Sequence, residues 1–241
     1  KTGSGAFMKS IDDSIALAKE MVAIGENAGR KTVALITDMD IPLGHNIGNS
    51  LEVIEAVETL KGNGPEDLTE VCVHLASNML FLAGKGTLEE CRSLVREVIA
   101  NGEALKRLAA MVEAQGGDSS VIFDTDKFEK AAYQHEVLAK KSGYITFMDT
   151  ESCGIASAML GAGRETKDSQ IDFAAGIILK KKVGDYVEAG EPMAVFYADK
   201  EELFAAAELR YQAAVTIEDE KANETPLVYA RVTKDQVERL A

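Results

Sequence analysis

The sequence contains little cysteine and no long apolar run, and these two absences exclude several classes of protein. Its three cysteines, Cys72, Cys91 and Cys153, are odd in number and far apart, which argues against a disulfide framework and a zinc site. Cys72 and Cys91 fall in helical patterns, where we expect small buried residues. Because no apolar stretch reaches about 18 residues, no membrane span is expected. The thiols suit a reducing cytoplasm.

The sequence also contains fewer basic than acidic residues: 26 lysines and arginines against 40 aspartates and glutamates give a formal net charge of −14. A field of that sign repels nucleic acid and anionic membranes, so we expect neither as a partner. An anionic substrate would need a local basic pocket. The first residues, KTGSG, lack an initiator Met and the apolar core of a signal peptide. We therefore expect this chain to be part of a longer protein.

The spacing of apolar residues predicts a helix-rich α/β arrangement for the first half. Ser10 and Asp13 begin a helix in the manner of a capping box, and Thr87 and Glu90 form a second box. The β-branched and apolar run at 32–37 suits a buried strand. Further helices are expected at 51–61 with Asn49 as its cap, at 65–82 with Pro65 in its first turn, and at 104–115.

The second half changes character and is rich in short β-runs. They are GYITFMD, IIL and PMAVFY, and they are followed by helical composition at 201–214. We predict an α/β fold: a partial large α/β domain at 1–117, a connecting segment at 118–141, and a small α+β C-terminal subdomain of barrel-sandwich or hammerhead type at 142–241.

The segment KTGSGAFM at residues 1–8 is a first candidate binding element. Gly3 and Gly5 allow close approach of the backbone or a positive φ. The segment fits neither the P-loop nor the dinucleotide fingerprint, so a plain strand-to-helix turn is the favoured interpretation. Phe7 could stack on a flat base or belong to the core, and from composition alone the core is favoured.

The loop at 38–48 is a second candidate, because it is rich in glycine, proline and acidic residues. Its carbonyls, with a carboxylate such as Glu55 on the next helix, could surround a hard monovalent cation, which prefers oxygen ligands. The alternative is that Asp38 and Asp40 serve only the turn. His74 and His135 have no partner at metal-ligand spacing, and no serine lies in a G-x-S-x-G elbow, so we assign no catalytic residue.

The pattern VGDYVEAGEPMAVFYADK at 183–200 is similar to lipoyl and biotinyl carriers, in which G-D-x-V-x-x-G precedes a modified lysine. Gly184, Asp185, Val187 and Gly190 match, and Lys200 lies near the expected place of modification. A carrier or interaction module centred here is the alternative function. The following residues read as helix rather than strand, which argues for a shared small β-fold and against modification.

Four segments taken in order resemble the pyrimidine-nucleoside and thymidine phosphorylases: KTGSGAFMK, GRKTVALITDMDIPLGHNIGNSLEV, AQGGD and IDFAAGIILKKKVGDYVEAG. The resemblance covers nearly the whole chain. It implies a homodimeric pentosyltransferase that converts a pyrimidine nucleoside and phosphate into free base and pentose 1-phosphate. It implies that Phe7 lines the base pocket. It also implies that the main-chain oxygens of Leu43 and Asn46, with the carboxylate of Glu55, bind a potassium ion.

The chain departs from the family at its catalytic segments. The glycine-rich phosphate loop and the residues that grip the pyrimidine precede KTGSGAF in the family, and we find no match to them here. The resemblance therefore implies that this chain alone is inactive. A related phosphoribosyltransferase is a third interpretation, in which Asp38 and Asp40 would bind magnesium near a diphosphate.

Overall fold

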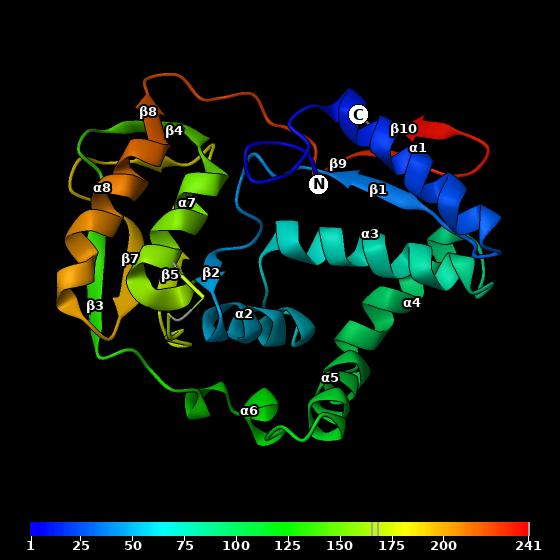
Figure 1. The fold of residues 1–241 in the computed structure, drawn as a ribbon, viewed down its shortest axis with the longest axis horizontal. Helices are drawn as coiled ribbons and strands as arrows, with labels where there is room; N and C mark the ends of the chain where they lie inside the picture. Colours follow the sequence, from blue (N-terminus) through cyan, green and yellow to red (C-terminus); the bar gives the residue numbers. More distant parts are fainter. Residues whose placement is uncertain (165, 168, 241) are drawn as a thin grey trace.

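A computed structural model describes residues 1–164, 166–167 and 169–240. Figure 1 shows two lobes, a β-rich lobe that carries α7 and α8 and a helical lobe that carries α1 and α3–α5. The helices are α1 (Ile11–Asn27), α2 (Ser50–Leu60), α3 (Glu66–Leu82), α4 (Leu88–Ala100), α5 (Glu103–Ala114), α6 (Ser120–Phe123), α7 (Thr150–Ser157) and α8 (Phe204–Ala214), with short turns η1 (Thr125–Lys127), η2 (Ala158–Ala162) and η3 (Glu201–Leu203).

The strands form three antiparallel sheets, ordered β1-β9-β10, β2-β5-β7-β3 and β6-β4-β8. Their bounds are β1 (Ala34–Thr37), β2 (Asn46–Gly48), β3 (Tyr133–Leu138), β4 (Gly143–Met148), β5 (Gly176–Leu179), β6 (Tyr186–Val187), β7 (Pro192–Ala198), β8 (Val215–Glu218), β9 (Val228–Val232) and β10 (Val237–Arg239). The mixture of helices and strands confirms the predicted α/β class.

In the helical lobe, the two predicted capping boxes begin α1 and α4. The Ser10 hydroxyl accepts the backbone N–H of Asp13 at 3.1 Å, and Thr87 and Glu90 satisfy each other's backbone donors. Helix α1 packs its apolar face on β1 and β9. The expectation of a buried strand at 32–37 is wrong for most of β1: among its residues only Ile36 is buried, because β1 lies at the edge of its sheet.

Three further local predictions need correction. Asn49 occupies the N-cap position of α2, but its side chain donates to the carbonyl of Ala162 at 2.7 Å instead of capping the helix. Pro65 is the N-cap of α3 rather than a residue of its first turn. Cys72 is exposed, because it lies on the side of α3 opposite to the buried Val71 and Val73, whereas Cys91 is buried as expected.

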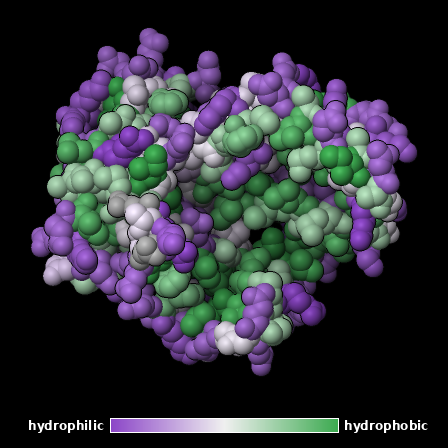
Figure 2. Space-filling model, viewed as in Figure 1, coloured by the Kyte–Doolittle hydropathy of each residue, from purple (hydrophilic) through white to green (hydrophobic). Residues whose placement is uncertain are grey.

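The β-rich lobe is built around one shared core. Its two sheets and the helices α7 and α8 bury a cluster in which the rings of Phe196 and Tyr211 meet edge to face, 5.6 Å apart. Such aromatic pairs combine a large buried area with a fixed geometry. Apolar side chains also gather in a hollow on the face shown in Figure 2, whereas hydrophilic residues cover its periphery. The described helices include none that is long and apolar enough to cross a bilayer.

The lobes do not follow the chain in sequence. Strand β2, from the first predicted domain, pairs with β5. Strand β9 returns from the last domain to pair with β1, and β10 pairs with β9. Strand β3, inside the predicted connecting segment at 118–141, pairs along its length with β7. The domain boundaries stay a prediction, and strands cross them at these three places. The pairing of β2 with β5 brings loop 38–48 against the β-rich lobe.

Candidate functional site

A pocket of about 950 Å³ lies where the N-terminal segment, loop 38–48, α2 and α7 meet. Its lining includes all four residues singled out from the sequence: Phe7, Leu43, Asn46 and Glu55. They come from three separate stretches of chain. The tertiary structure therefore brings the two candidate elements, KTGSGAFM and loop 38–48, into a single site.

Phe7 lies on the wall of this pocket with 92% of its surface exposed. The core placement favoured by composition is therefore wrong. An aromatic ring of that exposure gains little from the fold and presents a free face to the cavity. The position is compatible with stacking on a flat ligand.

The glycines beside Phe7 serve close packing within the protein. Gly3 has φ +119°, and a Cβ there would lie 2.7 Å from the backbone nitrogen of Asp40. A Cβ on Gly5 would lie 2.4 Å from the methyl group of Thr150. Ser4 is held between the same neighbours, since its N–H donates to Asp40 at 2.7 Å and its hydroxyl accepts the Thr150 N–H at 3.2 Å. The segment is thus the turn that the sequence favoured, and it fixes the backbone below Phe7.

Glu55 projects from α2 into the bend of loop 38–48 and is only 8% exposed. Its carboxylate accepts the N–H of His45 at 2.8 Å and the N–H of Asn46 at 3.4 Å. Burial raises the pKa of Glu55, and the two N–H groups offset this only in part. In the part of the chain that the structure describes, no ion pair with a basic side chain reaches this carboxylate, so a small cation would compensate a buried charge.

Gly44 allows the loop to wrap around this carboxylate. Its φ is +70°, and a Cβ would lie only 2.2 Å from Oε2 of Glu55. Any larger residue would meet both backbone strain and a steric clash.

The register of β2 shows where the carbonyl of Asn46 points. The Leu179 N–H donates to the carbonyl of His45 at 2.8 Å, and Asn46 lies opposite Ile178. Bonded and non-bonded pairs alternate along an antiparallel ladder, so the N–H and C=O of Asn46 both point away from β5. Its N–H goes to Glu55, and its carbonyl leaves the same outer edge of β2, on the side of α2.

Leu43 lines the same pocket as Asn46 and Glu55. Oxygen atoms of these three residues could hold a hard cation, since such ions take carbonyl and carboxylate ligands. The donor set fits a monovalent ion better than a transition metal, because it contains no nitrogen or sulfur ligand. The described residues contain no cluster of three or more His, Cys, Asp or Glu side chains with metal-binding geometry.

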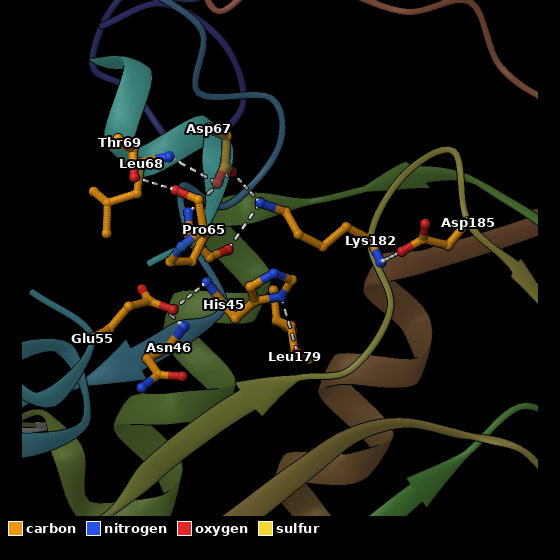
Figure 3. A network of polar contacts seen from close by, with 11 residues as sticks. His45, Asn46, Glu55, Pro65, Asp67, Leu68, Thr69, Leu179, Lys182 and Asp185 are labelled. Atoms are coloured by element: carbon orange, nitrogen blue, oxygen red, sulfur yellow. Dashed lines mark hydrogen bonds and ion pairs between the residues drawn. The ribbon is translucent and has the colours of Figure 1, made fainter. Parts of the chain in front are cut away.

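Two residues that sequence reasoning missed hold this loop from the other side. Lys182, in the turn between β5 and β6, donates to the carbonyl of Gly44 at 2.8 Å and forms an ion pair with Asp67 of α3. Asp67 in turn accepts the N–H of Gly44 at 3.1 Å. Figure 3 shows this network. Since Lys182 and Asp67 are 115 residues apart, no local pattern could have indicated the pair.

The geometry does not favour the two alternative interpretations, a magnesium site at Asp38 and Asp40 and a carrier module with a modified Lys200. Asp38 accepts a hydrogen bond from the Tyr229 hydroxyl at 3.0 Å, and Asp40 accepts the Ser4 N–H, so both proposed magnesium ligands are engaged within the protein. Burial raises the pKa of Asp38. Lys200 follows β7 and directly precedes η3 and α8, which is a strand-to-helix junction and not the hairpin tip of a carrier domain.

Comparison with known proteins agrees with this architecture. Residues 1–105 match the family model described as glycosyl transferase family, a/b domain, and residues 144–218 match the pyrimidine nucleoside phosphorylase C-terminal domain. The two matched regions place the chain in a class of proteins that join the a/b domain of the glycosyl transferase family to this C-terminal domain.

Individual proteins of similar sequence identify the family within this class. The chain is 52% identical over 202 residues to a pyrimidine-nucleoside phosphorylase of Bacillus subtilis (strain 168), a match that covers 83% of this chain and 47% of that protein. It is 47% identical over 235 residues to one of Staphylococcus aureus (strain USA300), covering 97% of this chain and 54% of that protein. The chain belongs to the pyrimidine-nucleoside phosphorylase family, and it spans about half the length of these relatives.

Proposed function

We propose that this chain forms one wall of the active site of a pyrimidine-nucleoside phosphorylase. The whole enzyme would transfer the pentosyl group of a pyrimidine nucleoside to phosphate and release the free base. The observation that carries this proposal is the meeting of Phe7, Leu43, Asn46 and Glu55 in one pocket of about 950 Å³. A pocket of that volume can hold a nucleoside.

In this proposal Phe7 contributes its exposed ring to the base side of the pocket. Leu43, Asn46 and Glu55 bind a potassium ion, which neutralises the buried carboxylate and stabilises the loop. The departing base gains negative charge in the reaction, and a positive group near it would stabilise the transition state. The segments that supply this group and the phosphate donors in the family have no counterpart that we recognise in the 241 residues. We therefore propose that these residues alone do not catalyse phosphorolysis.

We also infer from the family resemblance that the whole enzyme is a cytoplasmic homodimer. The sign of the net charge supports a small-molecule substrate over nucleic acid, since −14 repels a polyanion.

The test is release of free base from uridine or thymidine in the presence of phosphate, followed by ultraviolet absorbance. The chain alone is expected to be inactive. The second arm adds the part of the Staphylococcus aureus relative that the match leaves uncovered, and activity that requires both pieces would support the proposal. Turnover by the chain alone at an enzyme-like rate would contradict the proposed inactivity. Inactivity of both arms, with the two pieces shown to associate, would contradict the proposed function.

A further inference from the structure

The ion pair between Lys182 and Asp67 lies next to the proposed cation site and holds both polar backbone groups of one residue, Gly44. The Lys182 side chain is only 13% exposed, although it comes from the opposite lobe. Its ammonium group holds the carbonyl of Gly44, and Asp67 holds the N–H of the same residue. The turn that carries Lys182 is itself fixed, because the Lys182 N–H donates to Asp185 at 2.8 Å.

The backbone N–H groups of the next two residues along the loop are held by Glu55. The N–H groups of His45 and Asn46 both point at its carboxylate. Three successive N–H groups thus end on two carboxylates. The conformation of Gly44 decides whether the following two can reach Glu55, because a rotation at Gly44 would turn the rest of the loop away. Loop 43–46 is therefore fixed by partners from α2, α3 and the β-rich lobe.

Three charged side chains of this network, those of Asp67, Glu55 and Lys182, give it a net charge of −1. Asp67 and Glu55 bring two negative charges, and they accept the N–H groups of the neighbouring residues Gly44 and His45. Lys182 brings one positive charge. One negative charge remains uncompensated, which matches a monovalent cation, whereas two free carboxylates beside carbonyl oxygens would suit a divalent one.

We infer that Lys182 and Asp67 act as positioning and specificity-determining residues of the cation site. They clamp Gly44 so that the N–H groups of His45 and Asn46 stay on Glu55, and they hold the net charge of the site at −1. The site therefore favours potassium over calcium or magnesium. The part of this inference that concerns the ion rests on the proposed function, but the part that concerns the loop does not.

A buried ion pair does not by itself argue for a role in stability. The cost of removing both charges from water commonly offsets their attraction, and apolar replacements are often tolerated. Such a pair can instead fix the orientation of the backbone groups that it contacts, because charge-assisted hydrogen bonds are short and geometrically specific. Outer partners of this kind typically change metal affinity by about 10- to 100-fold.

The experiment uses the full 241-residue chain and four variants. Lys182→Met removes the clamp charge, and Asp67→Asn/Lys182→Met removes the pair without leaving an unpaired buried charge. Glu55→Gln tests the proposed ligand. Lys181→Met is the matched control, because Lys181 lies in the same turn as Lys182, but its ammonium group pairs with Glu191 at 2.7 Å and donates to the carbonyl of Tyr186 at 3.1 Å. Circular dichroism checks that each variant is folded.

Two readouts separate the loop from the ion. Hydrogen exchange of the His45 and Asn46 amides reports the loop, and titrations with thallium(I), a potassium probe, and with calcium report the site. In Lys182→Met we expect both amides to exchange about tenfold faster, thallium to bind about tenfold more weakly, and calcium to bind more tightly. In the double variant the two amides should exchange as fast as in Lys182→Met, but calcium should not bind more tightly than in the wild type. Lys181→Met should behave as the wild type.

Unchanged amide exchange in Lys182→Met and in the double variant would overturn the clamp. An unchanged ratio of thallium to calcium affinity in Lys182→Met would overturn the role in selectivity. If the wild type binds no thallium and Glu55→Gln changes nothing, the proposed cation site is wrong and the selectivity argument fails with it. Amide exchange would still decide the clamp in that case.

Discussion

The substitution Gly44→Ala tests whether loop 38–48 closes on Glu55 as the structure has it. Gly44 has φ +70°, and a Cβ there would lie 2.2 Å from Oε2 of Glu55. An L-residue in the left-handed region costs about 1 kcal/mol. Moving the buried Glu55 carboxylate away would break its hydrogen bonds to His45 and Asn46, which costs a further 1–3 kcal/mol or so. Together these terms predict a loss of roughly 2–4 kcal/mol in the free energy of unfolding.

Gly84 provides a matched control for this prediction. Its φ is +71°, nearly the same as that of Gly44, but nothing lies within 4 Å of a Cβ placed there. Gly84→Ala should therefore show the backbone cost alone, about 1 kcal/mol. Urea unfolding measures both variants, and a chain of this size should lose roughly 2–4 °C in Tm for each kcal/mol. Equal losses in the two variants would refute the packing of Glu55 against Gly44.

Three further predictions follow from burial and charge. Phe196→Ala should cost about 3–5 kcal/mol in urea unfolding, because the side chain is fully buried against Tyr211; a loss below about 1 kcal/mol would contradict the shared core. Phe7→Ala should change the free energy of unfolding by no more than about 0.5 kcal/mol, since the ring is exposed. A loss of several times that size would mean that Phe7 belongs to the core. Burial works to raise the pKa of Asp67, but Lys182 and two N–H groups outweigh it and lower that pKa below 3.8. Asp67 therefore stabilises the fold above its unfolded pKa and loses that effect as pH falls through the folded pKa. The stability difference between wild type and Asp67→Asn should shrink below about pH 4, and a constant difference from about pH 6 to pH 3 would contradict this origin.

Much of the local structure could be predicted from the sequence because its causes are local. The hydrogen bonds of Ser10 with Asp13, and of Thr87 with Glu90, join residues three apart, so their patterns predict where α1 and α4 begin. The positions of α3 and α5 follow from apolar spacing and glycine. Family membership rests on long continuous motifs, and these are also legible without a structure.

The site itself was decided by contacts between distant parts of the chain. Strand β9 pairs with β1 across about 190 residues, and Lys182 reaches Gly44 across 138. Such contacts depend on topology and loop closure, which no local pattern encodes. Asn49 illustrates the limit, since its position predicts a cap but a carbonyl in the other lobe takes its side chain. The sequence by itself determined the helices α1–α5 and α8, the α/β class and the family. The tertiary structure decided that Phe7 is exposed, that its segment meets Glu55 in one pocket, and that Lys182 and Asp67 hold the loop between them.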